Sequence, residues 1–548
     1  MDAPRNKNAY PKGRQADRES RAEVRSLIGD APRNRDLLIE FLHLIQDRYG
    51  HLSARHLAAL AQEMKISQAE VYETASFYHH FDIVKEGETE PAEMIVRVCD
   101  GIACEMAGAQ RLYAELSDDI GKSARVVKVP CVGGCFAAPV AVVGKKQVHE
   151  AEAGAVAKAL ADGDTTPELP DAVPLNEYRA AGGYGALEKL RNGGLGGADL
   201  IGELEAADLR GMGGAGFPTA RKWRFLEGTA KPRVLAVNAD EGEPGTFKDR
   251  YCFETAPHKV LDGALIAAAI IEAEDIYIYL RDEYPHIHAL LEREIEAVTK
   301  EGLAEGVRIH LRRGAGAYIC GEESGMLESI EGKRGLPRNR PPYPAQSGLF
   351  GRPTLINNVE TLYWVADIAR FGSQWYLDEG RPHLFSVSGR VRRPGVVRAP
   401  SGVTVRQLID EHCGGMAEGH VFKAYLPGGA SGGILPASKD GLALDFGVLE
   451  EFGCFVGSAA VVIFSEQDRI RDVVLNLLRF FADESCGQCT PCRVGCEKMV
   501  KLLEQDRWDQ PLMDDLSLAM REASICGLGQ AAPNPVQSAF RFFEGEIE

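Results

Sequence analysis

The sequence predicts a multidomain α/β protein that begins and ends in small helical units, and three observations support this prediction. The chain has 548 residues, which exceeds a single core at roughly 150 residues per domain. Helical and strand-like apolar patterns alternate through its middle, as in α/β domains. Most of its 13 cysteines gather in two short clusters, so two of the expected domains should carry clustered thiols.

Composition narrows the class of protein. Hydrophobic residues make up 45% and charged residues 26% of the chain, which is typical of a globular protein. The formal net charge of −18 argues against nucleic-acid binding, because phosphate neutralisation requires a Lys/Arg-rich surface. No apolar run approaches the roughly 20 residues of a membrane helix, and the N-terminus lacks an apolar signal core. We therefore expect a cytoplasmic protein without membrane insertion.

The first third of the chain divides by its patterning. Residues 1–35 are polar and are expected to form a flexible tail. Residues 36–90 carry apolar positions at helical spacing and should form a small helical bundle. Residues 91–165 alternate strands and helices around the first cysteine cluster. Residues 166–195 are interpreted as a linker, since residues 163–175 begin with the turn-rich stretch Gly-Asp-Thr-Thr-Pro.

The remaining two thirds fall into three expected domains. Residues 196–380 alternate helices, strands and glycine-rich loops, with strand candidates at 234–237, 276–280 and 307–311. Residues 381–465 are rich in strand signals and Gly/Pro turns, which predicts a small β-rich domain. Residues 466–548 should be helices around the second cysteine cluster.

The second cysteine cluster is the most specific motif. Cys486-Gly-Gln-Cys489-Thr-Pro-Cys492 is followed at a distance by Cys526. A [4Fe–4S] cluster needs four thiolates, and a C-x2-C-x2-C loop supplies three of them. Zinc sites use C-x2-C pairs and fit this spacing poorly. Cys496 also completes a C-x2-C-x2-C-x3-C run, although in such runs the fourth cysteine ligates another cluster and a proline follows it.

The first cluster consists of two cysteine pairs. Cys99 and Cys104 are separated by four residues, and Cys131 and Cys135 by three, each pair directly after an expected strand. Two pairs suit the two irons of a [2Fe–2S] cluster, with zinc or a redox dithiol as alternatives. The scattered cysteines are expected to be buried small hydrophobes; they are Cys252, Cys320, Cys413 and Cys454.

A glycine-rich loop lies at the start of the central domain. Gly211-Met-Gly213-Gly214-Ala-Gly216 matches G-x-G-x-x-G, but the preceding residues 200–209 look helical, whereas the dinucleotide fingerprint requires a strand there. The loop can still let a flat ring or a phosphate approach the backbone. Lys222, just beyond the loop, is suited to pair with an anion.

Acidic and amide side chains follow expected strands of the same domain. They occur in Asn238-Ala-Asp240-Glu241-Gly-Glu243 and in Gly321-Glu322-Glu323-Ser. Carboxylates at strand ends can hold ribose or ribityl hydroxyls, although a solvated turn is an equally good interpretation from composition alone. Asn357-Asn358 opens an apparent helix over 359–369, whose N-terminus can bind a phosphate.

These stretches together resemble a known family. The motifs around Gly211, Asn238, Gly321, Asn357 and Cys486 are similar to the 51-kDa-type NADH-binding subunit of respiratory complex I. Residues 36–160 resemble the 24-kDa-type subunit, joined ahead of it in one chain. Such fusions occur in NAD-dependent formate dehydrogenases and NAD-reducing hydrogenases. The runs 426–438 and 526–535 look closest to the β subunit of NAD-dependent molybdenum- or tungsten-containing formate dehydrogenase.

The resemblance implies an architecture and cofactors. It implies a helical bundle, a thioredoxin-like [2Fe–2S] domain, a Rossmann-like FMN/NADH domain, a ubiquitin-like β-grasp domain and a C-terminal helical [4Fe–4S] bundle. Cys526 would be the fourth [4Fe–4S] ligand, with Cys496 a bystander. The FMN-binding positions implied are Gly211, Gly213, Gly214, Lys222, Asn238, Asp240, Gly321, Glu322, Asn357, Asn358 and Thr361. Tyr318 belongs to the same cofactor-binding set.

The family also implies how NAD is held and used. The adenine would stack among Phe217, Phe225 and Tyr343. Glu243 and Glu323 would line the nicotinamide–ribose side, and Glu323 is also expected to disfavour the 2′-phosphate of NADP. NAD exchanges two electrons as hydride and iron–sulfur clusters exchange one, so a flavin must mediate between them. No catalytic acid or base is expected, and the [2Fe–2S] cluster would be a side reservoir or second conduit.

The expected partner is a large molybdenum- or tungsten-pterin, formate-oxidising α subunit with further iron–sulfur clusters. Nothing in the chain itself suggests a pterin site. Two alternatives stay open with identical chemistry in this chain: the diaphorase subunit of an NAD-reducing hydrogenase, and a fused complex I module. A non-catalytic iron–sulfur scaffold is disfavoured by the intact Gly, Lys and Glu motifs.

Overall fold

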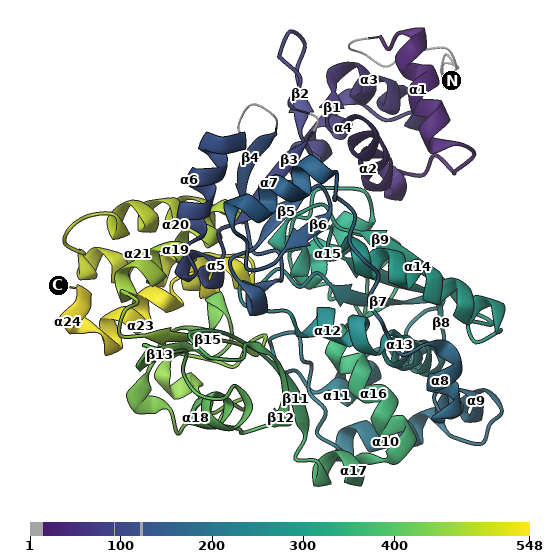
Figure 1. The fold of residues 1–548 in the computed structure, drawn as a ribbon. Coiled ribbons are helices and arrows are strands. Elements are labelled where there is room, and N and C mark those ends of the chain that lie inside the picture. Colours follow the sequence, from purple (N-terminus) through teal and green to yellow (C-terminus); the bar gives the residue numbers. More distant parts are fainter. Residues whose placement is uncertain (1–14, 93, 121–123, 548) are drawn as a thin grey trace.

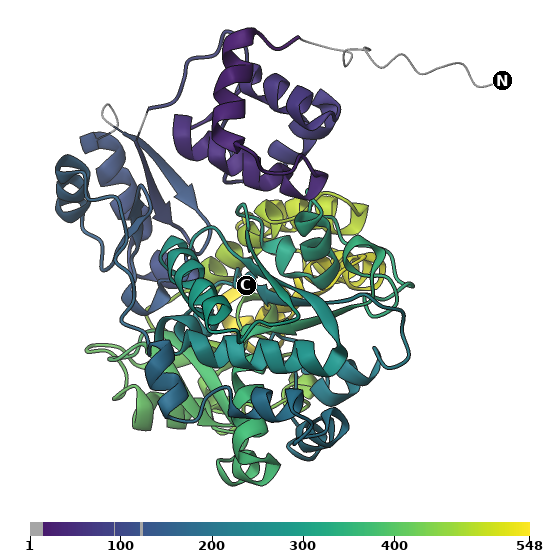
Figure 2. The same ribbon diagram turned by 90° about the vertical axis from the view of Figure 1, so that its right-hand side faces the viewer.

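The computed structural model describes residues 15–92, 94–120 and 124–547. Figures 1 and 2 show that the N-terminal bundle, in purple, lies at the top of both views, and that the β-rich domain, in green, lies at the bottom. The N-terminal bundle comprises helices α1 to α4 and the short parallel pair β1 (Leu52–Ser53) and β2 (Ile83–Val84). The helices span Arg18–Ile28, Leu38–Tyr49, Ala54–Met64 and Gln68–Ala75.

Helix α1 corrects the expectation of a flexible tail over residues 1–35. Asp17 caps the helix by accepting from the backbone N–H of Ser20 at 2.8 Å. Val24 and Ile28 are buried against the rest of the bundle. Only two apolar positions one turn apart are buried in an otherwise charged segment, so the helix gains its stability from tertiary packing rather than from its own composition. Residues 1–14 lie outside the described part of the chain.

The small α/β unit follows, and its strands occur where the sequence predicted them. Its sheet has the order β4-β3-β5-β6, with β3 and β4 parallel and the other pairs antiparallel. The strands are Ile95–Cys99 (β3), Arg125–Val129 (β4), Ala141–Val143 (β5) and Lys146–Val148 (β6). Helices α5 (Ile102–Met106), α6 (Ala109–Ile120) and α7 (Ala153–Asp162) complete the unit.

Part of the segment interpreted as a linker is instead helical. Helices α8 (Leu175–Ala180) and α9 (Gly185–Arg191) lie within it. Tyr184 is completely buried, and its hydroxyl lies 2.9 Å from Nδ1 of His258 in α13. These contacts join the segment to the core of the central domain, which residues 166–195 alone could not reveal because their buried partner lies more than 70 positions away.

The central domain is built on a parallel sheet in the order β10-β7-β8-β9. The strands are β7 (Arg233–Ala239), β8 (Ala273–Leu280), β9 (Arg308–Arg313) and β10 (Thr354–Asn358). The helices are α10 (Gly197–Ala206), α11 (Thr219–Arg224), α12 (Lys248–Thr255), α13 (Pro257–Ile271), α14 (Pro285–Lys300), α15 (Glu323–Ile330), α16 (Val359–Phe371) and α17 (Ser373–Asp378).

Both faces of this sheet are covered, as the continuous apolar runs of its strands require. Leu235 and Val237 of β7 join the core beneath α13 and α16. Val234 and Ala236 point to the opposite face, where they join α15 and the N-terminal bundle in one continuous core. Because the strands are parallel, their carboxyl ends meet at one edge, which gathers the loops that follow them.

The β-rich domain and the C-terminal bundle complete the chain. The mixed sheet has the order β12-β11-β15-β13-β14, formed by Gly395–Pro400, Pro382–Gly389, Ala460–Ser465, Phe422–Leu426 and Leu435–Pro436; helix α18 spans Val405–Gln407. The C-terminal helices α19 to α24 span Ile470–Asp483, Thr490–Leu503, Gln510–Ala523, Gly527–Ala531, Asn534–Phe542 and Glu544–Ile547. Among the described residues, no helix has both the length and the apolar character that a bilayer crossing demands.

Candidate flavin and iron–sulfur sites

The structure brings together the two cysteine pairs of the small α/β unit. Cys99 ends β3, Cys104 lies in α5, and Cys131 and Cys135 lie in the loop between β4 and β5. All four are at most 4% exposed. The sulfur atoms of Cys131 and Cys135 are 3.2 Å apart, and the Cys99 thiol contacts those of Cys104 and Cys131. Four unbonded thiols packed together fit the ligand set of a [2Fe–2S] cluster.

The central domain closes this first cysteine site. The loop after β7, residues 240–247, is termed the acidic loop. Its Gly245 presents a backbone N–H to the sulfurs of Cys131 and Cys135, and its Phe247 belongs to the same buried apolar cluster as both cysteines. Arg281, after β8, donates to the carbonyl of Cys131 at 2.7 Å. The Cys135 and Cys99 thiols, with the charge of Arg281, hold the pKa of Cys131 well below its usual range.

The second cysteine site lies among the C-terminal helices. Cys489 precedes α20 and Cys526 precedes α22, each as the N-cap residue, while Cys492 is in the first turn of α20. The backbone N–H groups of Leu528 and Gly529 face the Cys526 sulfur. Helix N-termini and N–H donors stabilise thiolates. Cys526 is also close to Cys486, so these four residues fit a [4Fe–4S] ligand set.

Cys496 remains the alternative fourth ligand. It is completely buried, one helical turn beyond Cys492, whose thiol it contacts. Cys526, by contrast, is partly exposed and shares the open side of the site with Cys486 and Cys489. The scattered cysteines are all buried, as expected; they are Cys252, Cys320, Cys413 and Cys454.

The glycine-rich loop precedes α11 and follows α10 rather than a strand, as the sequence predicted. The backbone N–H of Gly211 donates to the carbonyl of Phe217 at 2.8 Å, which closes the loop. A Cβ at Gly213 would lie 3.0 Å from Cβ of Asn358. Gly214 has a φ of +130°, which favours glycine. The loop therefore approaches the start of α16 more closely than side chains would permit.

Three asparagines lie at the carboxyl ends of β10 and β7, at the edge of the sheet where the glycine-rich loop approaches α16. Asn358 caps α16, accepting from the N–H of Glu360 at 2.9 Å, and Thr361 accepts from the N–H of Met212 at 2.9 Å. Asn238 donates to the carbonyl of Gly321 at 2.8 Å. Asn357 accepts from the indole of Trp223 at 3.0 Å. The predicted flavin positions from four separate segments thus meet at one edge of the sheet.

Asp240 supplies an observation that points to a bound group. Its Oδ2 is buried and has no hydrogen-bond partner among the described residues. Burial raises the pKa of its carboxyl well above the ordinary value. A buried polar atom without a partner is costly, and a hydroxyl-bearing ligand beside Gly321 would satisfy it. The loop, the three asparagines and this carboxyl are together a good fit for FMN.

A buried ion-pair network contacts Asn358 at the start of α16. Asn358 donates to Asp249 at 2.6 Å. Lys248 is 1% exposed and lies 2.9 Å from Asp249 and 3.0 Å from Glu360. Removing one member of such a buried pair typically costs about 3–5 kcal/mol. The network therefore fixes the position of Asn358.

Glu243 is held by residues from two other segments. Its carboxylate accepts from the hydroxyl of Tyr318 and from both the N–H and the hydroxyl of Ser431, at 2.8 and 2.7 Å. Burial raises the pKa of the Glu243 carboxyl above its usual range. Ser431 belongs to the β-rich domain, and no motif in the sequence pairs it with a residue 188 positions earlier.

Glu322 and Glu323 share a cation that sequence reasoning missed. Arg340 pairs with Glu322 and lies 3.1 Å from Glu323. Lys222 approaches Glu323 at 3.5 Å. Glu322 also caps α15 through the N–H groups of Ser324 and Gly325. Arg340 therefore joins the two carboxylates, and Glu323 alone also lies at ion-pair distance from Lys222, just beyond the glycine loop.

Of the three aromatic residues expected to hold adenine, two are together. The rings of Phe217 and Phe225 are 5.9 Å apart, and the guanidinium of Arg221 lies over both. They are 37% and 50% exposed, which suits a platform for a flat ring. Tyr343 is 54% exposed and makes no ring contact with this pair among the described residues.

The acidic loop connects the flavin region to both cysteine sites. On one side, Gly245 and Phe247 contact the first site. On the other, Tyr318 bonds Glu243 and donates its backbone N–H to Glu484 at 2.8 Å, two residues before Cys486. Burial raises the pKa of the Glu484 carboxyl to about 7. One short segment thus lies between the predicted flavin position and two thiol clusters.

Family models match these regions one by one. Residues 24–163 match the thioredoxin-like [2Fe–2S] ferredoxin, and residues 204–367 match the Nuo51 FMN-binding domain. Residues 384–435 match the SLBB domain. Residues 472–548 match the iron–sulfur binding region of NADH-ubiquinone oxidoreductase-F. The matches establish the domain types and the cofactors: FMN, NAD(H), a [2Fe–2S] cluster and a [4Fe–4S] cluster.

Whole proteins of two kinds resemble the chain. The second F-type subunit of the NADH-quinone oxidoreductase of Rhizobium meliloti (strain 1021) is 40% identical over 400 residues, which cover 69% of this chain and 95% of that one. The F-type subunit of the Aquifex aeolicus (strain VF5) enzyme is 40% identical over 393 residues, covering 68% and 90%. A chain of an NAD+-reducing [NiFe]-hydrogenase in its air-oxidised state superposes with a TM-score of 0.82 at 33% identity, covering 94% of both chains. The chain therefore belongs to the family of F-type subunits of NADH-quinone oxidoreductase, the NADH-binding flavin and iron–sulfur electron-transfer subunits.

Proposed function

We propose that this chain is the NAD-linked electron-transfer subunit of an NAD-dependent formate dehydrogenase. At the family level it is an FMN-dependent NAD(H) oxidoreductase subunit that transfers electrons through iron–sulfur clusters. FMN, when bound, exchanges hydride with nicotinamide and single electrons with the clusters. The observation that carries the electron-transfer role is the acidic loop, which contacts the first cysteine site directly and is linked to the second through Tyr318 and Glu484.

In this proposal, the chain's own residues bind FMN and NAD and orient them for hydride exchange. The glycine loop, with Asn358 and Thr361, forms the surface against which FMN would lie. Asp240 offers an acceptor to a ribityl hydroxyl. Glu243, fixed by Tyr318 and Ser431, would face the nicotinamide side of NAD. No side chain in this set is required as an acid or base, since hydride exchange needs orientation and exclusion of water.

Glu323 is proposed to select NAD over NADP. Its carboxylate would accept hydrogen bonds from ribose hydroxyls and repel a 2′-phosphate. In the structure it is positioned by Lys222 and Arg340. Glu323→Gln is expected to raise the NADPH/NADH ratio of kcat/KM, because repulsion is removed while both cations remain. Glu243→Gln is the matched control, expected to impair use of both nucleotides without altering that ratio. An unchanged ratio in Glu323→Gln would show that Glu323 does not discriminate between NAD and NADP.

The proposed partner is a large subunit that oxidises formate at a pterin-bound molybdenum or tungsten. Support comes from the runs 426–438 and 526–535, which resemble the formate dehydrogenase β subunit. The first includes Ser431, which anchors Glu243, and the second includes Cys526. A cytoplasmic location is part of the proposal.

A hydrogenase partner is the second candidate. The solved NAD+-reducing hydrogenase chain matches 94% of this chain, whereas the Rhizobium meliloti relative matches 69% of it. Purifying the chain from its native cell with its partners attached decides between them. NAD+ reduction by formate and not by hydrogen is expected. Reduction by hydrogen alone would replace the formate proposal, and the isolated chain should use NADH with artificial acceptors yet ignore formate.

A further inference from the structure

One short loop of the central domain receives three hydrogen bonds from the N-terminal bundle. Residues 314–317, termed the β9 loop, join the end of β9 to Tyr318 and form neither helix nor strand. The donors and acceptors are Nε2 of His43 to the carbonyl of Gly314 at 2.8 Å, the N–H of His80 to Ala315 at 3.1 Å, and the N–H of His79 to Gly316 at 3.3 Å. A carbonyl can only accept, so Nε2 of His43 carries the proton. Three successive carbonyls are thus satisfied by another domain.

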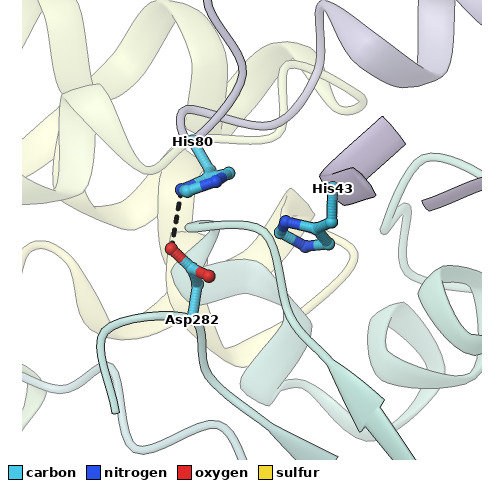
Figure 3. Close-up of side chains that lie close together, drawn as sticks. All are labelled: His43, His80 and Asp282. Carbon is cyan, nitrogen blue, oxygen red and sulfur yellow. Dashed lines mark ion pairs between the residues drawn. The ribbon is translucent and has the colours of Figure 1, made fainter. Parts of the chain in front are cut away.

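Side chains of the bundle also hold the segments around the β9 loop. Nδ1 of His80 lies 2.6 Å from Oδ2 of Asp282, which follows β8. Figure 3 shows this ion pair beside the His43 ring. The hydroxyl of Tyr78 lies 2.9 Å from that of Ser329, near the end of α15. The bundle therefore contacts the ends of β8 and α15 as well as the loop between them.

A glycine permits the close approach of the β9 loop to the bundle. Gly316 has a φ of +72°, in the left-handed region that favours glycine. A Cβ at this position would lie 3.4 Å from the backbone N and 3.7 Å from the Cβ of His80. Any other residue would therefore combine backbone strain with a new contact against the bundle.

Unfilled space lies beside the β9 loop. A cavity of about 240 Å³ is bordered by Gly316, Ala317 and Tyr318 and by Asp240 and Gly242 of the acidic loop. This volume is far more than the ~10–15 Å³ that one water needs. The β9 loop thus has room to move toward the acidic loop, so its hydrogen bonds to the bundle are needed to fix its position.

The β9 loop leads directly into the proposed nucleotide site. Tyr318, which follows it, donates its hydroxyl to Glu243 and its N–H to Glu484 at 2.8 Å. A shift of the loop would move Tyr318 and deprive Glu243 of one of its donors. The other donors to Glu243 belong to Ser431 of the β-rich domain, which the loop does not position.

We propose that the N-terminal bundle positions the NAD site through the β9 loop, with His43 as a positioning residue that acts on Glu243 through Tyr318. This role of the bundle rests on the proposed place of Glu243 at the nicotinamide side. Packing alone would account for the burial of Ala315 and Ala317 against the bundle. It would not account for three hydrogen bonds directed at consecutive carbonyls next to Tyr318.

A matched pair of His43 variants tests the proposal in the holoprotein with its flavin and clusters. His43→Leu removes the donor to Gly314, whereas His43→Gln keeps an amide N–H with a reach similar to that of Nε2. With ferricyanide as the electron acceptor, His43→Leu should raise the KM for NADH about fivefold, as expected for the loss of one hydrogen bond. Its kcat and its FMN and iron contents should not change, and His43→Gln should restore most of the KM. An unchanged KM in His43→Leu, or an equal rise in both variants, would overturn the proposal.

Hydrogen exchange measures the hold on the β9 loop in the absence of NAD. Gly316→Ala is compared with Gly302→Ala. Gly302 also has a φ of +72°, but no atom of the described residues lies within 4 Å of a Cβ there, so the control carries similar strain without touching the bundle. The amides of His79, His80 and Tyr318 should exchange about tenfold faster in Gly316→Ala than in the control, because local opening exposes them. The KM for NADH should rise in Gly316→Ala alone.

The glycine pair also decides the case in which His43→Leu fails to fold. Equal exchange in the two glycine variants would overturn the proposal, and so would faster exchange in Gly316→Ala with an unchanged KM. Failure of the proposed role of Glu243 is read separately, because Glu243→Gln would then leave the KM for NADH unchanged while exchange still reported the hold on the loop.

Discussion

The two cysteine sites differ in how they are enclosed. The first, Cys99, Cys104, Cys131 and Cys135, is fully buried, because the central domain covers it with Gly245, Phe247 and Arg281. In the second, only Cys492 is fully buried, while Cys486, Cys489 and Cys526 are partly exposed. The first is an internal site held between domains. The second belongs to one helical bundle and opens outward, which favours it as the site that would contact a partner protein.

The largest expected effect tests the ligands of the open site. Cys526→Ser should abolish the [4Fe–4S] signal in electron paramagnetic resonance of the reduced protein and keep the [2Fe–2S] signal. Iron should fall from about six to about two per chain, since the clusters hold four and two irons. Cys496→Ser is the control and should keep both signals. Loss of the [4Fe–4S] signal in Cys496→Ser instead would show that Cys496 is the fourth ligand.

A pair of glycine substitutions compares the packing around the two sites. A Cβ at Gly529 would lie 2.8 Å from Cβ of Cys492 and 2.5 Å from Oγ of Ser524, whereas one at Gly101 would lie 3.1 Å from Cβ of Cys131. Overpacking typically costs ~1–3 kcal/mol. Gly529→Ala should therefore lose most of its [4Fe–4S] content, measured by spin quantitation, and Gly101→Ala only a minor part of its [2Fe–2S] content. Equal losses would contradict the difference in clearance.

Chelation of iron measures the enclosure directly. In the unaltered protein, an iron chelator should remove the [4Fe–4S] iron several-fold faster (~10-fold) than the [2Fe–2S] iron, because water and chelator reach partly exposed ligands first. Phe247→Ala should accelerate loss from the first site alone, since Phe247 belongs to the buried apolar cluster that contains Cys131 and Cys135. Faster release from the first site in the unaltered protein would refute the proposed order.

The smallest expected effect concerns the charge beside the internal site. Arg281 is 4% exposed and donates to Cys131, and a nearby positive charge favours the reduced cluster, which carries the extra electron. Arg281→Gln should lower the [2Fe–2S] potential by about 60 mV, the tenfold change of a one-electron couple. The [4Fe–4S] potential should not move. Arg281→Lys should restore most of the shift, and Arg312→Gln, whose arginine pairs with Asp36, is a distant control. A shift common to both clusters would indicate a general disturbance.

The sequence by itself determined much of the local structure. Strands β3, β4, β7, β8 and β9 and helix α16 occur where apolar periodicity predicted them. The cysteine spacings predicted two clusters, because iron–sulfur clusters are commonly held by thiolates at such short spacings together with one or more from elsewhere. Local patterning failed for α1 and for the segment that contains α9, whose few buried side chains, such as Val24 and Tyr184, are stabilised by distant partners.

Only the tertiary structure decided which segments meet. The carboxyl ends of parallel strands share one edge, which brings the acidic loop, Arg281 and Asn358 together although they are far apart in sequence. The bond of Ser431 to Glu243 spans 188 residues, and that of Tyr318 to Glu484 spans 166. Such contacts depend on domain packing and on hydrogen-bond direction, and neither of these produces a periodic pattern of residues in the sequence. For the same reason, the bond of His43 to Gly314 could be found only in the folded chain.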